Sequence, residues 1–382
     1  MNIIFFGSTS DSVIVLEKLL SCHLPSVTCH LSCIVTQPPA PIGRKQIVTP
    51  TPVEIWAKDH HIPVCSFLTS QDKPWLYKNE EEVVNTLSTF KPDLLVSACY
   101  GQKIPKQTIT ETTHGGLNIH PSVLPRWRGA DPVPWTILTD DKQAGVTVVT
   151  ITDTFDQGKI IAQKKINITD TDVPDLLRTK LFHEGADLLA ASLPDYVSGK
   201  NKGNDQKPEL ATYARKLTRQ DGFIPWKILQ HAIDENSICH CEDPDATSGD
   251  EAIPIIKTAA SHQITSDNDN LSYFIWIMRM IRALHPWPGV WSEIPLSFLR
   301  PPASAMLQAL RAGRQESIHK NMDPESRLRQ GFAGRGKPED DKITKRLKII
   351  EAHVEKEKLV LDTVQLEGKN PVQWSEFEKA YL

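Results

Sequence analysis

The chain lacks several features that would place it in a special class of protein. No stretch approaches the roughly 20 consecutive apolar residues that a membrane-spanning helix needs. The start, Met1–Gly7, carries neither a basic leader nor a small-residue cleavage site, so a buried first strand is predicted there and a signal peptide is not. There are no internal repeats, and the isolated Gly7 does not form the G-x-G-x-x-G pattern of a dinucleotide-binding turn.

Cysteine is scarce and shows no framework spacing. The seven cysteines are an odd number, which argues against a disulfide scaffold and favours a reducing, cytoplasmic setting. Cys22-His23, Cys29-His30 and Cys33 lie close together and raise the alternative of a zinc site. However, Cys29 and Cys33 alternate with polar residues as in a half-buried strand, and no paired C-x-x-C is present. We therefore expect no metal.

The composition is that of an ordinary globular protein with an uneven charge distribution. Its 382 residues suffice for two domains, and 40% of them are hydrophobic. The net charge of −4 argues mildly against a nucleic-acid partner. Nevertheless, residues 295–346 hold eleven Lys or Arg against six acidic residues, whereas residues 234–270 are strongly acidic. Because nucleic acids bind to local patches of positive charge, the negative net charge of the chain does not exclude tRNA as a partner.

The first two hundred residues alternate short apolar runs with amphipathic segments, which predicts an α/β fold with a parallel sheet covered on both faces. We expect strands at Ile3–Phe6, Val27–Val35, Asp93–Ala98, Gly116–Ile119 and Val146–Ile151, and helices from about Asp11, at Pro52–Asp59, Glu80–Thr89 and Asp172–Ser198. The predicted catalytic domain is 1–199. The polar, aperiodic residues 200–210 are interpreted as a linker.

The remainder, 211–382, is predicted to be a second domain. It contains an apolar-rich helix at 271–284, two strands at Arg346–Val354 and Lys358–Gln365, and a closing helix with aromatic residues at helical spacing. Short strands with a helix suggest a small, OB-like β-barrel. Residues near 236–265 and 300–344 show weak periodicity and are interpreted as insertions.

Three residues carry the clearest chemical signal. Asn118 and His120 lie at the end of a predicted strand, where open α/β sheets bind their ligands, and Asp156 follows in Phe-Asp-Gln-Gly158. An amide can donate a hydrogen bond to a developing oxyanion, and an imidazole can move a proton. A carboxylate can orient the imidazole and stabilise its charged form. A buried core histidine, a strand-end asparagine and a plain turn aspartate are the alternatives.

The motifs around these residues resemble the formyltransferases that use 10-formyltetrahydrofolate. The similarity runs nearly end to end. Its landmarks are Phe6–Ser8, Thr36–Pro38 with Gly43–Lys45, Ser97–Gly101, Leu117–Gly129, Asp156–Gly158, Ala211–Leu217, His285–Trp291 and Val364–Lys369. The Asn-x-His pair with the aspartate is shared by the family and indicates the chemistry without indicating the acceptor. The last two stretches lie in the second domain, and they resemble the members that act on methionyl-tRNA.

The resemblance implies a Rossmann-like formyltransferase domain with Asn118, His120 and Asp156 as catalytic residues. It implies transfer of a formyl group to the α-amine of methionyl-tRNA, as in translation initiation, without a metal. The folate co-substrate is expected to contact Tyr100, Gly101, Pro121, Ser122, Val123 and Leu124. The tRNA is expected to contact Arg44, Lys45, Arg215, Lys216 and Arg219. For Tyr100 and Gly101 the alternative is a simple turn, and for Pro121–Leu124 it is a loop without a special role. For the basic residues it is a solvated surface. We expect a cytoplasmic monomer.

Two other functions stay open at this point. The same chemistry on the amine of a sugar nucleotide would need a nucleotide-shaped pocket but no basic loop or second domain. A non-catalytic RNA-binding relative belongs to a different class, and the intact set of Asn, His and Asp argues against it.

Overall fold

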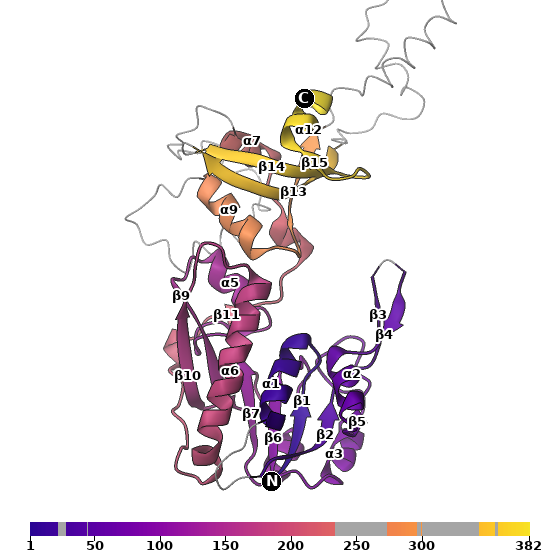
Figure 1. Ribbon diagram of the computed structural model, residues 1–382, viewed down its shortest axis with the longest axis vertical. Coiled ribbons are helices and arrows are strands. Elements are labelled where there is room, and N and C mark those ends of the chain that lie inside the picture. Colours follow the sequence, from indigo (N-terminus) through magenta and orange to yellow (C-terminus); the bar gives the residue numbers. More distant parts are fainter. Residues whose placement is uncertain (22–27, 44, 234–272, 296–298, 300–343, 356–357) are drawn as a thin grey trace, which may run out of the picture. The chain divides into compact units, whose positions relative to one another are not determined.

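The computed structural model describes residues 1–21, 28–43, 45–233, 273–295, 299, 344–355 and 358–382. The chain divides into two compact units, Met1–Leu217 and Thr218–Leu382 (Figure 1). Several predicted features therefore lie outside the described residues: Arg44, both insertions apart from Thr344, and the Cys22-His23 part of the cysteine cluster.

The first unit is built on a seven-stranded, mostly parallel sheet, which confirms the predicted α/β class. Its strand order is β10 (Ile160–Asn167), β9 (Gln143–Thr150), β7 (Gly116–His120), β6 (Leu94–Ala98), β1 (Asn2–Phe6), β2 (His30–Val35) and β5 (Val64–Cys65). The pairs from β7 to β5 are parallel, whereas β9 is antiparallel to both β7 and β10. The chain thus reverses direction beside β7, the strand that carries Asn118 and His120.

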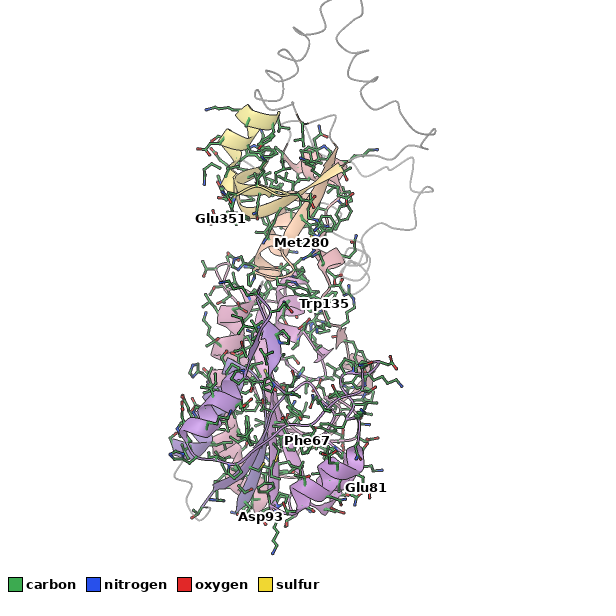
Figure 2. All side chains as sticks on the ribbon, turned by 90° about the vertical axis from the view of Figure 1, so that its right-hand side faces the viewer. Phe67, Glu81, Asp93, Trp135, Met280 and Glu351 are labelled. Carbon is green, nitrogen blue, oxygen red and sulfur yellow. The ribbon has the colours of Figure 1, made fainter. Side chains whose placement is uncertain are left out.

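Helices cover both faces of this sheet, because its central strands are apolar on both sides. They are α1 (Ser10–Ser21), α2 (Pro52–Asp59), α3 (Glu80–Ser88), α4 (Lys106–Glu111), α5 (Pro132–Leu138) and α6 (Pro174–Val197). Ile3 to Phe6 are fully buried, and since strand side chains alternate, Ile4 and Phe6 face a cluster that includes Val83 of α3. α1 and α6 pack against each other and against the sheet. Figure 2 shows the side chains of this unit, with Phe67 and Trp135 labelled.

Two short pairs of strands and a 3-10 helix complete the first unit. β3 (Ala40–Ile42) and β4 (Ile47–Thr49) form an antiparallel hairpin, and β8 (Arg128–Gly129) pairs in parallel with β11 (Tyr213–Ala214). A 3-10 helix, η1 (Pro208–Leu210), precedes β11. The segment 201–217 therefore belongs structurally to the first unit. It contacts that unit through backbone and side-chain hydrogen bonds, so the unit extends beyond the predicted boundary at 199 and beyond the predicted linker.

The second unit holds a separate antiparallel sheet. Its strands are ordered β12 (Val290–Pro295), β13 (Thr344–Glu355), β14 (Lys358–Leu366) and β15 (Val372–Gln373), and its helices are η2 (Arg219–Gly222), α7 (Trp226–Ile233), α9 (Tyr273–Ala283) and α12 (Trp374–Tyr381). Buried apolar residues such as Leu347, Val364, Met280 and Phe377 form its interior. The predicted helix at 271–284 and the two predicted strands are confirmed within the described residues; the barrel stays a prediction.

In the part of the chain that the structure describes, no helix combines the length and the apolar content that a transmembrane span requires.

The buried centre of the sheet generates a prediction for stability. Leu95 of β6 is fully buried in the cluster between the sheet and α3. Leu95→Ala should lower the free energy of unfolding by about 2–5 kcal/mol, because it removes buried apolar surface and leaves a cavity. The matched control is Leu20→Ala on α1, where the leucine is 53% exposed and the expected loss is small. Urea unfolding followed by tryptophan fluorescence measures both, and equal losses would contradict the assignment of Leu95 to the core.

Candidate active site

β7 carries two of the three predicted catalytic residues. Asn118 and His120 are two positions apart, so their side chains leave the same face of the sheet. Asn118 pairs with Ser97 of β6 and with Val149 of β9, and His120 pairs with Thr147 of β9. Strand β7 is parallel to β6 and antiparallel to β9. Asn118 and His120 therefore lie between two strands that run in opposite directions.

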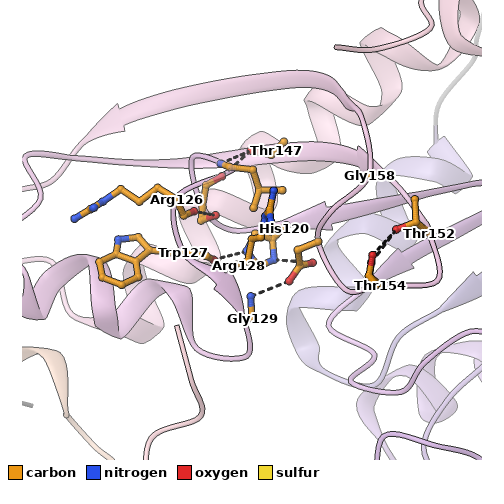
Figure 3. A network of polar contacts seen from close by, with 12 residues as sticks. His120, Arg126, Trp127, Arg128, Gly129, Thr147, Thr152, Thr154 and Gly158 are labelled. Carbon is orange, nitrogen blue, oxygen red and sulfur yellow. Dashed lines mark hydrogen bonds and ion pairs between the residues drawn. The ribbon is translucent and has the colours of Figure 1, made fainter. Parts of the chain in front are cut away.

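The His120 ring is buried and both of its nitrogens have partners. Nε2 lies 2.8 Å from the backbone oxygen of Trp127, and Nδ1 lies 3.4 Å from Oδ1 of Asp156 (Figure 3). A backbone carbonyl only accepts hydrogen bonds, so Nε2 carries the hydrogen in this contact. In the neutral ring Nδ1 then bears the lone pair, and it faces the carboxylate. A proton gained at Nδ1 would form an ion pair with Asp156.

The Asp156 side chain is held by the backbone of β8. Its Oδ2 accepts a hydrogen bond of 2.9 Å from the backbone N–H of Gly129, while Oδ1 faces the histidine. The side chain is only 10% exposed. Asp156 itself has a φ of 57°, a left-handed conformation that a residue with a side chain adopts infrequently. The loop between β9 and β10 is thus shaped so that the carboxylate meets His120.

Gly158 is the glycine on which this loop depends. A Cβ atom added there would lie 1.8 Å from the backbone oxygen of Thr150, at the end of β9. No side chain can occupy that space, so only glycine lets the loop return so close to the strand. The glycine two residues after Asp156 in the sequence therefore has a direct steric reason.

The side chain of Asn118 differs from its neighbours. It is half-buried, and among the described residues none forms a hydrogen bond with its side-chain amide. A buried strand is an unfavourable place for asparagine unless its amide has a partner. The amide is therefore available to a group that enters the site.

The loop after β7 is tied down by polar contacts. Thr147 donates a hydrogen bond of 2.7 Å to the backbone oxygen of Ser122, and Gln163 of β10 donates one of 2.9 Å to the backbone oxygen of Leu124. Ser122 and Leu124 are buried, whereas Pro121 and Val123 are half-buried. Among the four residues of this loop that are predicted to contact the folate, Pro121 and Val123 thus keep more exposed surface.

Tyr100 and Gly101 follow β6. The Tyr100 side chain is buried in the core cluster, where its hydroxyl lies 2.7 Å from that of Tyr77. Burial raises the pKa of Tyr100, so its hydroxyl stays neutral. Gln37 donates a hydrogen bond of 2.8 Å to the Tyr100 backbone oxygen. Any contact of Tyr100 with a ligand is therefore restricted to its backbone.

The described residues that are predicted to contact tRNA come from three separate segments of the chain. Lys45 is exposed in the β3–β4 hairpin, and Arg215 and Lys216 are exposed just after β11. Arg219 is exposed on η2, in the second unit. The Arg215 guanidinium lies 5.3 Å from the ring of Trp135, whose Nε1 donates to the Arg215 backbone oxygen. The Arg215 guanidinium therefore packs against Trp135 within the first unit.

Sequence reasoning missed the residues that surround the three predicted catalytic positions. Arg126 and Trp127 both donate to the half-buried Asp141, and Gln206 donates to the loop of Asp156. Gln206 lies in a polar, aperiodic stretch, which gives no signal of a contact with a loop fifty residues earlier. In the described residues, no group of three or more His, Cys, Asp or Glu side chains has the arrangement of a metal site.

Comparisons with known proteins identify the family of this chain. The family model described as formyl transferase matches residues 1–193, about half of the chain. The methionyl-tRNA formyltransferase of Listeria welshimeri is 38% identical over 225 residues, which is 59% of this chain and 68% of that protein. The enzyme of the same name from Halalkalibacterium halodurans is 35% identical over 227 residues, again 59% and 68%.

One similar solved structure is that of the phosphoribosylglycinamide formyltransferase of Bacillus halodurans. It is 26% identical and covers 53% of this chain and 97% of that one, with a TM-score of 0.43. On the match of the family model and the sequence relatives, this chain belongs to the formyl transferase family.

Proposed function

We propose that the protein is a cytoplasmic enzyme that transfers the formyl group of 10-formyltetrahydrofolate to the α-amine of methionyl-tRNA. The observation that carries this proposal is the His120 ring, fixed through Nε2 by the Trp127 carbonyl and facing Asp156 through Nδ1. The names of the sequence relatives support the acceptor.

In the proposed reaction, the amine nitrogen attacks the formyl carbon and a carbon–nitrogen bond forms. The formyl oxygen gains negative charge, and the Asn118 amide donates a hydrogen bond to it. His120 accepts the proton that the attacking nitrogen loses, and Asp156 stabilises the resulting imidazolium. The proton then passes to N10 of the folate as the bond between N10 and the formyl carbon breaks.

The folate is proposed to lie against the loop Pro121–Leu124 and the backbone of Tyr100 and Gly101. Support comes from the hydrogen bonds of Thr147 and Gln163, which hold that loop beside His120. A fixed wall lowers the entropy lost when the two reactants are brought together. Direct attack by the amine requires no covalent intermediate with the protein.

The tRNA is proposed to be bound by Lys45, by Arg215 and Lys216, by Arg219, and by an OB-like second domain. Phosphate contacts from exposed Lys and Arg give affinity without reading sequence. The role assigned to Arg44 follows from the resemblance alone, since this residue is outside the described part of the chain.

The proposal predicts the effect of removing the proposed proton acceptor. His120→Ala should abolish formyl transfer while binding of methionyl-tRNA stays within a few fold, because His120 acts on the proton and not on the RNA. Transfer of labelled formyl groups and filter binding measure the two quantities. The control is His183→Ala, an exposed histidine of α6. Turnover preserved in His120→Ala would remove His120 from the mechanism.

A second prediction concerns the oxyanion. Asn118→Ala should lower kcat by about 100- to 1,000-fold, the usual loss for one such donor, with little change in KM for methionyl-tRNA. Asn85→Ala, at an exposed position of α3, makes the same chemical change away from the site and should leave kcat unaltered. A large rise in KM with unchanged kcat would instead assign Asn118 to substrate binding.

The acceptor is tested by direct competition. Purified protein with labelled 10-formyltetrahydrofolate should formylate methionyl-tRNA and should leave an amino-sugar nucleotide unmodified. Preferential labelling of the sugar nucleotide would overturn the proposed acceptor while retaining the chemistry. No labelling of either compound would overturn the proposed function.

A further inference from the structure

The Gln206 side chain connects a buried arginine to the loop of Asp156. Its Nε2 donates hydrogen bonds of 2.8 Å to the backbone oxygens of both Asp156 and Gly158. Its Oε1 accepts hydrogen bonds from Arg128, of 3.0 Å from Nε and 2.7 Å from Nη2. Gln206 thus binds the backbone of the loop on both sides of Gln157. One of the two residues bound, Asp156, is the residue that faces His120.

The chemistry of the partners determines the orientation of this amide. Backbone oxygens only accept hydrogen bonds, and a guanidinium only donates them. The nitrogen of the amide must therefore face the loop and its oxygen must face Arg128. Both hydrogens and both acceptor positions are used, so the amide has no alternative arrangement that satisfies the same four contacts.

Arg128 and Gln206 are themselves held in place by the backbone. Arg128 is buried in β8, and its N–H donates to the backbone oxygen of Thr212 at 2.9 Å. On the other side, Asn204 and Ile160 exchange backbone hydrogen bonds of 2.8 and 2.9 Å, two residues before Gln206. The amide is therefore presented to the loop from a fixed backbone.

The loop needs such a support, because its own conformation is not an easy one. Asp156 has a φ of 57°, which a residue with a side chain adopts at some cost. Among the described residues, one backbone N–H, that of Gly129, donates to the carboxylate. Hydrogen bonds to the carbonyls of Asp156 and Gly158 fix the backbone on both sides of the turn, and so fix the direction of the carboxylate.

We infer that Gln206, oriented by Arg128, is a positioning residue that holds the Asp156 carboxylate against His120. This inference rests on the proposed function, since it gives the residue its role in formyl transfer. Gln206 does not contact the reacting atoms. Its removal should displace the carboxylate without removing a catalytic side chain, and displacement of about 1 Å can cost on the order of 100-fold in rate.

The test uses the full-length protein with Gln206→Leu and Gln206→Glu. Leucine removes all four hydrogen bonds, whereas glutamate keeps a partner for Arg128 but presents oxygens to the two loop carbonyls. Both variants should lower kcat by about 10- to 100-fold, with KM for methionyl-tRNA and for the folate within about twofold. Full activity in Gln206→Glu would show that pairing with Arg128 is the whole role of Gln206, and would overturn the inference.

A double-variant comparison separates positioning from general stability. In an Asp156→Asn background, Gln206→Leu should cause no further loss of kcat, because residues that act through one another are not additive. A full additional loss would show that Gln206 acts elsewhere and would overturn the inference. Gln143→Leu, at an exposed position of β9, is the matched control and should keep wild-type kcat.

Hydrogen exchange of residues 150–160 gives a readout that needs no substrate. Gln206→Leu should lose protection in this loop, and Gln143→Leu should not. Unchanged protection with wild-type kinetics would overturn the inference. If the wild-type protein itself fails to formylate methionyl-tRNA, the proposed function fails, whereas lost loop protection would still support the structural part of the inference.

Discussion

The site depends on one arrangement, the His120 ring between the carbonyl of Trp127 and the carboxylate of Asp156. The carbonyl can only accept a hydrogen bond, so it selects the tautomer and leaves Nδ1 facing the carboxylate. The backbone of Trp127, and not the carboxylate of Asp156, thus fixes which ring nitrogen carries the hydrogen. The carboxylate is then placed to stabilise a proton gained by the ring.

The site is completed by a segment that follows the predicted catalytic domain. Residues 201–217 supply Gln206, the strand β11 that pairs with β8, and Thr212, whose hydroxyl accepts a hydrogen bond from the Trp127 N–H. Composition alone predicts a linker there. Polar, aperiodic residues suit a free linker, and they suit equally a segment that crosses the surface of a domain and forms hydrogen bonds with it. The sequence does not distinguish these two cases.

Most of the first unit is predictable from its pattern of apolar residues. Pro52–Asp59 coincides with α2, and the buried runs at Ile3–Phe6 and Asp93–Ala98 appear as β1 and β6. β10 was not predicted. It is an edge strand with the exposed residues Lys164 and Lys165 at its centre, so it lacks the apolar run that a covered strand shows.

The sequence by itself determined the types and spacing of the chemical groups: an amide and an imidazole two residues apart on one strand, and a carboxylate before a glycine. Alternation along a strand is local, so the shared face of Asn118 and His120 follows from sequence alone. Only the tertiary structure decided how Asp156 meets His120, which nitrogen carries the hydrogen, and that Gln206 supports the loop. Those contacts join segments far apart in the chain, and such pairings arise from packing, which no local pattern encodes.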